Sequence, residues 1–393
     1  MRLSYEELKS VVKSVIDNAG ISVNSFVETR NNTVGLLDKI GKIVNLDTEY
    51  QIDKLAVFDG EYLSFGKTIE EWASDLIMPE SYDASGSSAL APHRSTYRPV
   101  FYSYTCGRKK IPQTIDYNDI ERAVHFEAQF IEIISNKYKR ISDSMAVYRY
   151  GLKREILAKF YDIATSDDLG MTGADKTWDA SETTAWNSEI NAKAENGAMV
   201  VNVTDDNLVD SSYEGKYINV KVIEASSTKT LKQLVADGSL IKLDLVSELA
   251  IPVDDTTGEA FIKQLKKDVE VASDLSEGHS LNGNTLGATS GLVLVVRQGI
   301  MPSIQVDTLA GAFQKEELAM PTEVLVVKDF GSAPEDLYAV LVDRRAVRLH
   351  NTYNATRENL NGDGDFLNVF RHTEDTAYIS RNAFVKFYCK PSA

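Results

Sequence analysis

The chain has 393 residues and a formal net charge of -16, from 42 basic and 58 acidic side chains. Affinity for nucleic acid rests on clustered Lys and Arg, so this balance argues against a protein whose main task is to bind nucleic acid. A hydrophobic content of 43% and a charged content of 25% are ordinary for globular protein. The length allows a sizeable core, divided among about two or three compact units.

Membrane and secretory signals are missing from the sequence. No apolar run approaches the roughly 20 residues that cross a bilayer, and Met1–Glu7 lacks the apolar core of a signal peptide. We therefore expect no membrane partner and folding in a cytosol. Cys106 and Cys389 are far apart and each lies in a strand-like run, which is typical of buried unpaired thiols rather than of a disulfide framework.

The first predicted element is a short amphipathic helix at Leu3–Ala19, which Gly20 ends. Val23–Thr33 is polar and predicts an extended arm. Leu36–Val44 is apolar enough to anchor that arm.

A long hairpin is predicted next, between Val44 and Lys110. Its strand-forming segments are Tyr62–Ile69 and Tyr97–Cys106, and Pro79–Pro92 between them offers turn residues and little to pack. A two-stranded hairpin is marginally stable alone in water, so it should lie on another surface, which a neighbouring copy of the chain would provide. The residues expected to make this contact between subunits are Tyr62, Phe65, Lys67, Trp72, Arg98 and Tyr102.

From Tyr117 to Ile163 the apolar residues recur three or four positions apart, which predicts one long amphipathic helix. Asp116 and Asn118 are candidate amino-terminal caps, because either side chain can accept a hydrogen bond from a first-turn amide. Gly151 is the position where a kink or a split is expected.

Ser166–Asp255 differs from the rest of the chain in being strongly acidic. It places Trp178 and Trp186 in a polar setting and then shows short β patterns at Met199–Val203 and Tyr217–Ile223. These features predict an inserted β-rich domain.

The last part of the chain alternates between helix and strand. Continuous apolar runs such as Leu292–Val296 predict a sheet that is covered on both faces. The alternation at Phe384–Cys389 predicts a strand with one buried and one semi-exposed face. The predicted elements are a helix at Thr257–Val271, a Gly-rich loop at Gly278–Gly291, a strand at Leu292–Arg297, a helix at Val306–Leu318, strands at Val324–Val327 and Tyr338–Val342, and a closing strand region at Ala377–Lys390.

The sequence gives no reason to expect a catalytic residue, a metal site or a cofactor. None of the five histidines has the spacing or the companions of a zinc site. His279 and Ser280 lack a Gly-x-Ser-x-Gly elbow, so an ordinary surface loop is expected there. Gly278–Gly291 follows no strand and lacks Gly-Lys-Ser/Thr, so flexibility accounts for its glycines better than phosphate binding. Asn359–Asp365 superficially resembles a calcium loop, but Phe370 replaces the bidentate Glu, which leaves a turn.

Three basic clusters have two possible roles. Each could touch a phosphate backbone, or each could be a partner for the excess carboxylates. The clusters are Arg108–Lys110, Lys137 with Lys139 and Arg140, and Arg344–Arg345.

The order of the elements resembles the Hong Kong 97 type of phage coat-protein fold: an arm, a long hairpin, a long helix, a compact α/β unit and a β return. Short motifs are also similar to those of the phi-29-like major capsid proteins, which belong to short-tailed phages of Gram-positive bacteria. These motifs are Leu37–Gly41, Gly66–Glu71, Ala339–Asp343 and Ser380–Val385. The resemblance covers nearly the whole chain, but the stretch from Ser166 to about Leu240 has no counterpart in it.

The resemblance implies an α+β capsid fold with an inserted β-rich domain. The implied regions are 1–43, N-terminal helix and arm; 44–115, extended hairpin; 116–165, spine helix of a peripheral domain; 166–255, acidic inserted domain; 256–345, axial α/β domain; and 346–393, return strands of the peripheral domain.

The resemblance also implies a function. The chain would assemble as pentamers and hexamers into an icosahedral shell around a double-stranded DNA genome, in the host cytoplasm, and would reside in the virion. Implied partners are a separate scaffolding protein, a portal protein and packaged DNA, which it would contact weakly and non-specifically. Lys137, Lys139 and Arg140 would face the lumen.

Two alternatives remain open. A cellular nanocompartment shell has the same fold and would enclose an enzyme instead of DNA. A carbohydrate-binding protein could use Trp178 and Trp186, because exposed tryptophans stack on sugars, and it would stay monomeric.

Overall fold

The structure is a computed structural model that describes residues 53–64, 66, 68–74, 97–101, 104–116, 127–170, 175–178, 200–203, 213–219, 229–304 and 322–391. The predicted helix and arm before residue 44 and the predicted helix Val306–Leu318 lie outside these residues. The chain divides into two compact units. One contains Met1–Tyr50, Gln113–Asp143 and Glu358–Val369, and the other contains Gln51–Pro112, Ser144–Arg357 and Phe370–Ala393.

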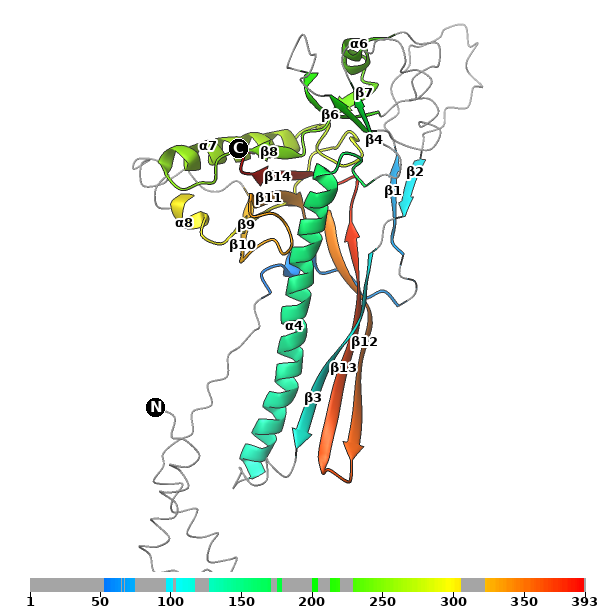
Figure 1. The fold of residues 1–393 in the computed structure, drawn as a ribbon, viewed down its shortest axis with the longest axis vertical. Helices are drawn as coiled ribbons and strands as arrows, with labels where there is room; N and C mark the ends of the chain where they lie inside the picture. Colours follow the sequence, from blue (N-terminus) through cyan, green and yellow to red (C-terminus); the bar gives the residue numbers. More distant parts are fainter. Residues whose placement is uncertain are drawn as a thin grey trace, which may run out of the picture. The chain divides into compact units, whose positions relative to one another are not determined.

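The longest element is helix α4, Glu127–Thr165, which confirms the predicted amphipathic helix (Figure 1). It continues through Gly151 without a split. Asp116, one of the two expected caps, is the last residue of strand β3, Tyr104–Asp116, and residues 117–126 that follow it lie outside the described part of the chain. The other candidate cap, Asn118, lies outside the described residues.

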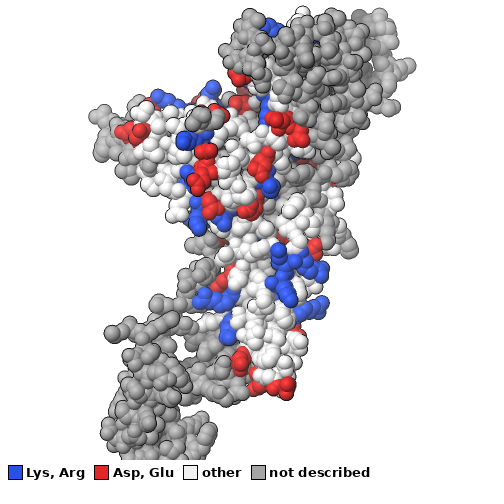
Figure 2. Space-filling model, in the orientation of Figure 1, with Lys and Arg blue, Asp and Glu red and all other residues white. Residues whose placement is uncertain are grey.

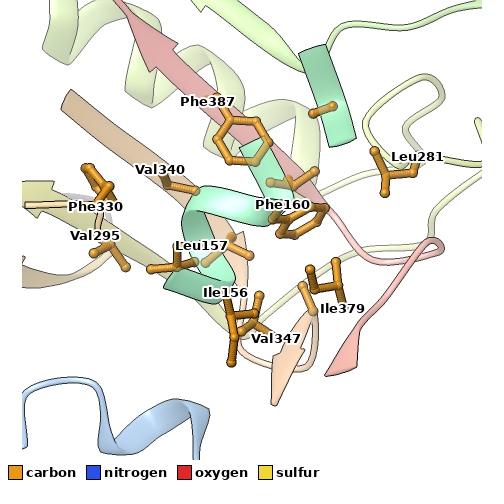
Figure 3. Packing of buried hydrophobic residues seen from close by; sticks show 14 of the residues in the cluster. Ile156, Leu157, Phe160, Leu281, Val295, Phe330, Val340, Val347, Ile379 and Phe387 are labelled. Atoms are coloured by element: carbon orange, nitrogen blue, oxygen red, sulfur yellow. The ribbon is translucent and has the colours of Figure 1, made fainter. Parts of the chain in front are cut away.

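In the second unit, α4 packs its apolar stripe against a five-stranded sheet (Figure 3). Ile156, Leu157 and Phe160 are at most 5% exposed. The ring of Phe160 meets Phe387 edge-on, with 5.5 Å between ring centroids. Each such side chain stabilises the fold by about 1.5–3 kcal/mol on burial, so this contact is a main source of stability for the unit.

The five strands follow the order β10-β9-β11-β14-β8. Strand β10 runs parallel to β9, and β11 runs antiparallel to both β9 and β14. The strands are β8, Val246–Glu248; β9, Leu292–Arg297; β10, Glu323–Val327; β11, Leu337–Asp343; and β14, Val385–Cys389. The three strands predicted between residues 292 and 342 are therefore confirmed.

Both faces of this sheet are covered, as its continuous apolar runs predicted. Val293 and Val295 pack into the cluster that contains the α4 side chains, whereas Leu294 and Val296 pack into a second cluster with helix α7, Asp255–Ala272. Successive side chains of a strand point to opposite faces, so a strand between two helices must be apolar at every position.

The closing part of the chain differs from the prediction. All five residues of β14 are buried, so the expected semi-exposed face is wrong, because α4 and α7 cover the two faces of the sheet. Strand β14 also pairs with β11, so only β12, Val347–Asn361, and β13, Phe366–Ile379, are return strands. Strand β8, expected in the insertion, joins the same five-stranded sheet through β14.

The region expected to be a β-rich insertion contains a four-stranded sheet with the order β4-β5-β6-β7. Its strands are β4, Asp175–Trp178; β5, Val200–Val203; β6, Gly215–Asn219; and β7, Leu240–Lys242, and helix α6 spans Leu231–Ala236. A separate apolar cluster joins this sheet to α6 through Val201, Tyr217 and Leu234.

The glycines of the loop after α7 were expected to provide flexibility, and this expectation is wrong for Gly278 and Gly283. Gly278 and Gly283 have φ angles of +78° and +64°. A Cβ atom on Gly278 would lie 2.1 Å from the carbonyl oxygen of Lys242, and one on Gly283 would lie 2.3 Å from Cγ2 of Ile218. Both positions require glycine, because the loop packs tightly on the inserted sheet.

A third sheet has the order β12-β13-β3. Its hairpin tip belongs to the first unit and contains the turn predicted near Asn361. The Asn361 Oδ1 atom accepts hydrogen bonds from the amides of Asp363 and Gly364, at 3.0 and 3.2 Å. The described helices include none that is both long and apolar enough to cross a membrane.

Gly278→Ala should lower the free energy of unfolding by about 3 kcal/mol or more, because it adds left-handed strain to a clash with backbone. Gly287→Ala is the matched control, since a Cβ atom there would meet nothing within 4 Å. Urea unfolding of the two purified variants measures the difference. Equal stability of both variants would contradict the structural role of Gly278.

Candidate functional site

The predicted hairpin exists, but its first strand is not where the sequence placed it. Strand β1, Glu70–Ser74, pairs antiparallel with β2, Tyr97–Phe101, as a separate two-stranded sheet. The strand predicted at Tyr62–Ile69 is wrong. The amide of Leu63 instead donates to the carbonyl of Asn351 at 2.9 Å, so the chain here follows β12.

Residues 53–63, which were expected in the hairpin, belong to the core of the second unit. Leu55 and Phe58 have no exposed surface and join the cluster that contains the α4 side chains. The amide of Gly60 donates to the carbonyl of Leu349 at 3.0 Å. Arg348 donates to the carbonyls of residues 57 and 59, at 2.9 and 3.0 Å. The hairpin is therefore shorter than residues 44–115.

The other end of the predicted hairpin, from Tyr104 onward, also belongs to a larger sheet and not to a two-stranded hairpin. Strand β3 pairs with β13 and not with β1. Cys106 and Ile115 of β3 are buried, and Cys106 packs into the cluster that contains the α4 side chains. Cys106 is a free thiol as expected. What remains of the predicted hairpin among the described residues is the pair of strands β1 and β2, which we call the ribbon.

The six residues expected to contact another subunit are not all brought together. Trp72 lies in β1 and is 64% exposed, whereas Tyr62 is 59% exposed but lies outside the ribbon. Arg98 lies in β2, opposite Ala73. Phe65, Lys67 and Tyr102 lie outside the described residues.

Glu71 anchors the base of the ribbon to the body. Its carboxylate accepts a hydrogen bond from the Ser380 hydroxyl and another, at 3.0 Å, from the Arg381 amide. Burial and the charge of Glu71 together raise the pKa of Tyr378. Hydrogen bonds to a carboxylate are stronger than hydrogen bonds between neutral groups. The Glu71 side chain therefore fixes the start of the ribbon against residues 380 and 381.

Arg381 extends this anchor to the turn that follows α4 and to the loop after α7. It is 7% exposed, and its guanidinium donates to the carbonyl of Leu169 at 2.9 Å. Its own carbonyl accepts from the amide of Asn282 at 3.0 Å. Asn282 Nδ2 in turn donates to Asn382 Oδ1 at 2.9 Å. The ribbon base, the turn after α4 and the loop after α7 therefore meet at residues 380–382.

A second anchor holds the segment that leads into the ribbon. Lys153 of α4 has no exposed surface, and its ammonium bridges Asp53 at 2.5 Å and Asp59 at 2.8 Å. Arg149, one turn earlier, contacts Asp59 at 3.2 Å and the buried Asp375 of β13 at 3.4 Å. A buried charged group needs an oppositely charged partner to offset its loss of hydration. Here these ion pairs also hold residues 53–59 against α4.

Neither anchor was predicted from the sequence. Lys153 is three residues before the buried Ile156, so it lies on the stripe that faces the core. A lysine on such a stripe indicates a buried ion pair, and this signal could have identified it. Glu71 and Ser380 both lie in the motifs that carried the family resemblance, but nothing in the sequence pairs them.

The basic clusters mostly have structural partners. Arg344 pairs with Glu323, and Arg345 pairs with Asp343 at 2.8 Å, so the second expected role is confirmed for this cluster. In the first unit, Lys137 donates to the carbonyl of Thr114 at 3.3 Å. Lys139 is partly buried and Arg140 is exposed.

His279 and Ser280 were expected on a surface loop, and this expectation is wrong. His279 is 7% exposed, Ser280 is fully buried, and the imidazole stacks on Phe384 at 5.2 Å. The imidazole Nε2 atom lies 3.5 Å from a carboxylate oxygen of Asp244, whose other oxygen pairs with the buried Lys386. The cluster joins the loop to β14. Among the described residues, no three His, Cys, Asp or Glu side chains gather as a metal site.

The pKa of Asp244 results from opposing effects. Burial raises the pKa, but a hydrogen bond from His279 and the charge of Lys386 outweigh this effect and hold the pKa below its ordinary value of 3.8. On α7, burial raises the pKa of Asp268, whose carboxylate accepts from the Tyr388 hydroxyl at 2.7 Å. The interactions of Asp244 and Asp268 stabilise the five-stranded sheet and the elements packed on it, and neither carboxylate is arranged around a nucleophile.

A family model described as Phi29-like phage major capsid protein matches residues 3–387. The chain therefore belongs to the Phi29-like phage major capsid protein family, and it is a structural protein that forms the capsid shell of a bacteriophage. Its place is the virion. No curated protein matches the chain in sequence.

Solved phage capsids have a similar fold. The capsid structure of Staphylococcus phage Andhra matches with a TM-score of 0.53 at 8% identity, over 90% of this chain and 89% of that chain. The capsid structure of the Cyanophage P-SCSP1u matches with a TM-score of 0.49 at 7% identity, over 90% of this chain and 92% of that chain. Such low identity shows the fold alone. The predicted α+β fold of the Hong Kong 97 type is confirmed.

Lys153→Met should lower the free energy of unfolding by about 3 kcal/mol, because it leaves Asp53 and Asp59 without their buried cation. Lys159→Met is the control on the same helix, since its pair with Asp162 is exposed. Removal of such a surface pair should cost less than about 1 kcal/mol. Chemical denaturation measures both variants, and losses of the same size would contradict this role of the Lys153 ion pairs.

Asp244→Asn should change how stability depends on pH. Because the folded pKa of Asp244 lies below 3.8, its carboxylate contributes stability above that pH and loses the contribution as the pH falls further. The wild type should therefore exceed the variant in thermal midpoint near neutral pH, and the gap should narrow between about pH 4 and about pH 2. A gap that stays constant as the pH falls would contradict the assignment.

Proposed function

We propose that the chain assembles as pentamers and hexamers into an icosahedral shell around a double-stranded DNA genome, in a short-tailed phage of a Gram-positive host. Membership of the Phi29-like family supports this proposal. Assembly takes place in the host cytoplasm, with a separate scaffolding protein that shapes the shell and a portal protein at one vertex.

The observation that carries the mechanism is the ribbon of β1 and β2. A two-stranded sheet is marginally stable by itself, and this one is not part of the three larger sheets. It is fixed at its base by Glu71 and yet exposes Trp72. In the proposed shell the ribbon lies over an adjacent subunit, which covers its apolar surface. Trp72 and Arg98 are the proposed contacts within the described strands, and Phe65, Lys67 and Tyr102 are proposed contacts beside them.

The regions take the following proposed roles. Helix α4 with β3, β12 and β13 forms the peripheral domain, and the five-stranded sheet with α7 forms the axial domain that points toward the five- or sixfold axis. The acidic insertion between α4 and α7 faces outward, because it would be repelled by packaged DNA. Lys137, Lys139 and Arg140 face the lumen, where they reduce the repulsion from the genome through weak non-specific contacts.

Replacement of residues 70–101 by a short Gly-Ser linker should leave a folded protein that forms no closed shell. The rest of the protein should still fold, because the variant retains Leu55 and Phe58, which are fully buried and lie before residue 70. The variant and the wild type are co-expressed with the scaffolding protein, and the products are imaged by electron microscopy. Normal closed particles of the variant would overturn the proposed role of the ribbon.

A further inference from the structure

The tip of the β12-β13 hairpin holds an Asn-Gly pair, Asn361–Gly362. Residues 358–365 are all exposed, and Figure 2 shows Asp and Glu side chains gathered at this tip. A backbone amide that follows an asparagine can attack the side-chain carbonyl carbon, because the two groups are held close together in one chain. Glycine leaves the approach to its nitrogen open, since it has no side chain. The pair is therefore a candidate site of chemical modification.

The hairpin turn polarises the side-chain carbonyl of Asn361. Its Oδ1 atom accepts hydrogen bonds from the amides of Asp363 and Gly364, at 3.0 and 3.2 Å. Negative charge develops on this same oxygen when the carbonyl carbon is attacked. Backbone donors that are already aimed at such an oxygen lower the barrier, as they do in an oxyanion hole. The turn therefore stabilises the transition state of an attack on Asn361 as well as its own conformation.

The attacking amide of Gly362 is accessible to solvent. A Cβ atom on Gly362 would meet nothing within 4 Å, so water and hydroxide reach the backbone here. Among the described turns and loops, the Gly362 amide has no carbonyl acceptor. No such hydrogen bond therefore has to break before the nitrogen attacks.

A second Asn-Gly pair, Asn282–Gly283, lies in the opposite environment. Asn282 is 9% exposed, and its Nδ2 atom donates to Asn382 Oδ1 at 2.9 Å. The amide of Gly283 donates to the carbonyl of Ser280 at 3.0 Å. Attack at Asn282 would have to break these bonds inside a packed loop, so this pair serves as an internal control. The third Asn-Gly pair of the sequence, at residues 196 and 197, lies outside the described residues.

We propose that Asn361 is a site of spontaneous deamidation in the folded protein, with water as the co-reactant. Hydroxide removes the amide proton of Gly362, and the nitrogen attacks Cγ of Asn361. The intermediate expels the side-chain nitrogen, which takes a proton from water and leaves as ammonia, so a succinimide remains. Water then opens this ring at either carbonyl, which gives aspartate or isoaspartate. No group is oxidised or reduced.

Either product changes the hairpin tip. Each adds a negative charge beside Asp363 and Asp365, which are exposed. Aspartate keeps the turn, because a carboxylate accepts the two amide hydrogen bonds more strongly than a neutral carbonyl does. Isoaspartate adds a methylene group to the backbone and so lengthens the connection between β12 and β13. The reaction needs no contact between subunits, so this inference does not depend on the proposed function.

Incubation of the purified full-length protein in mildly alkaline heavy-oxygen water tests the proposal. Each new carboxylate takes up heavy oxygen, so peptide mass spectrometry after a protease digest in ordinary water counts only the deamidation that occurred during the incubation. Asn361 should react about tenfold or more faster than Asn282 while the protein is folded. In concentrated urea the two rates should converge, because the dipeptide is the same at both sites.

A variant at the neighbouring glycine tests the route. Gly362→Ala should slow the reaction at Asn361 about tenfold, because the added methyl group hinders the approach of the nitrogen to Cγ. The thermal midpoint should stay that of the wild type, since a Cβ atom there meets nothing within 4 Å. Deamidation at the two control positions in the same chain should be unchanged.

Three results would overturn the proposal. The first is an equal rate at Asn361 and Asn282 in the folded protein. The second is a slower reaction of Asn361 in the folded protein than in urea, because the turn would then protect the side chain. The third is a folded Gly362→Ala variant that reacts as fast as the wild type, since the heavy oxygen would then enter by a route that does not involve the Gly362 nitrogen.

Discussion

The buried ammonium of Lys153 is the interaction on which the placement of the ribbon depends. Lys153 has no exposed surface, and it lies between Asp53 and Asp59. The pair of carboxylates brackets Leu55 and Phe58, which fill the core beside α4. Charge pairing and apolar burial therefore fix the same short segment. The chain then runs beside β12 as far as Leu63, so the packing of residues 53–63 fixes the position at which β1 begins.

Glu71 completes the constraint at the base of the ribbon. Its bonds to Ser380 and Arg381 leave the outer face of β1 exposed. A ribbon whose base is fixed loses less entropy when it binds a surface than a free segment does, because its direction is already restricted. A capsid subunit gains from this arrangement. In the proposed shell, the chain folds before assembly and neighbouring copies cover the two-stranded sheet, which is marginally stable by itself.

The sequence predicted the elements that obey a simple period. The stripe of α4, the buried run of β9 and the hairpin turn at Asn361 were all predicted from local pattern. Local pattern could not identify which strands pair, so β14 and β8 were assigned to the wrong regions. It also could not separate a flexible glycine from one such as Gly278, whose neighbour Lys242 is distant in sequence.

The candidate contact residues show the same limit. Exposure of Trp72 follows from its strand position, but the anchoring role of Glu71 requires residue 380, more than three hundred positions away. The first ribbon strand was predicted at Tyr62–Ile69, before its observed position in β1, because Tyr62–Ile69 has a composition typical of strands. The local sequence does not show that Leu63 lies beside β12. Strand propensity describes how a side chain fits a pleated surface, and pairing decides which surface is available.

Net charge sets a further requirement on the shell. Copies that each carry a formal charge of -16 repel one another as they approach, so attraction between them must come from local surfaces of opposite sign or from apolar contact. Single exposed ion pairs contribute only about 0.2–1 kcal/mol, and salt screens them beyond about 8–10 Å. Such contacts are weak enough to break and re-form during growth. Stability of the closed particle then comes from the number of contacts that each subunit makes simultaneously, because dissociation of one copy requires all of them to open.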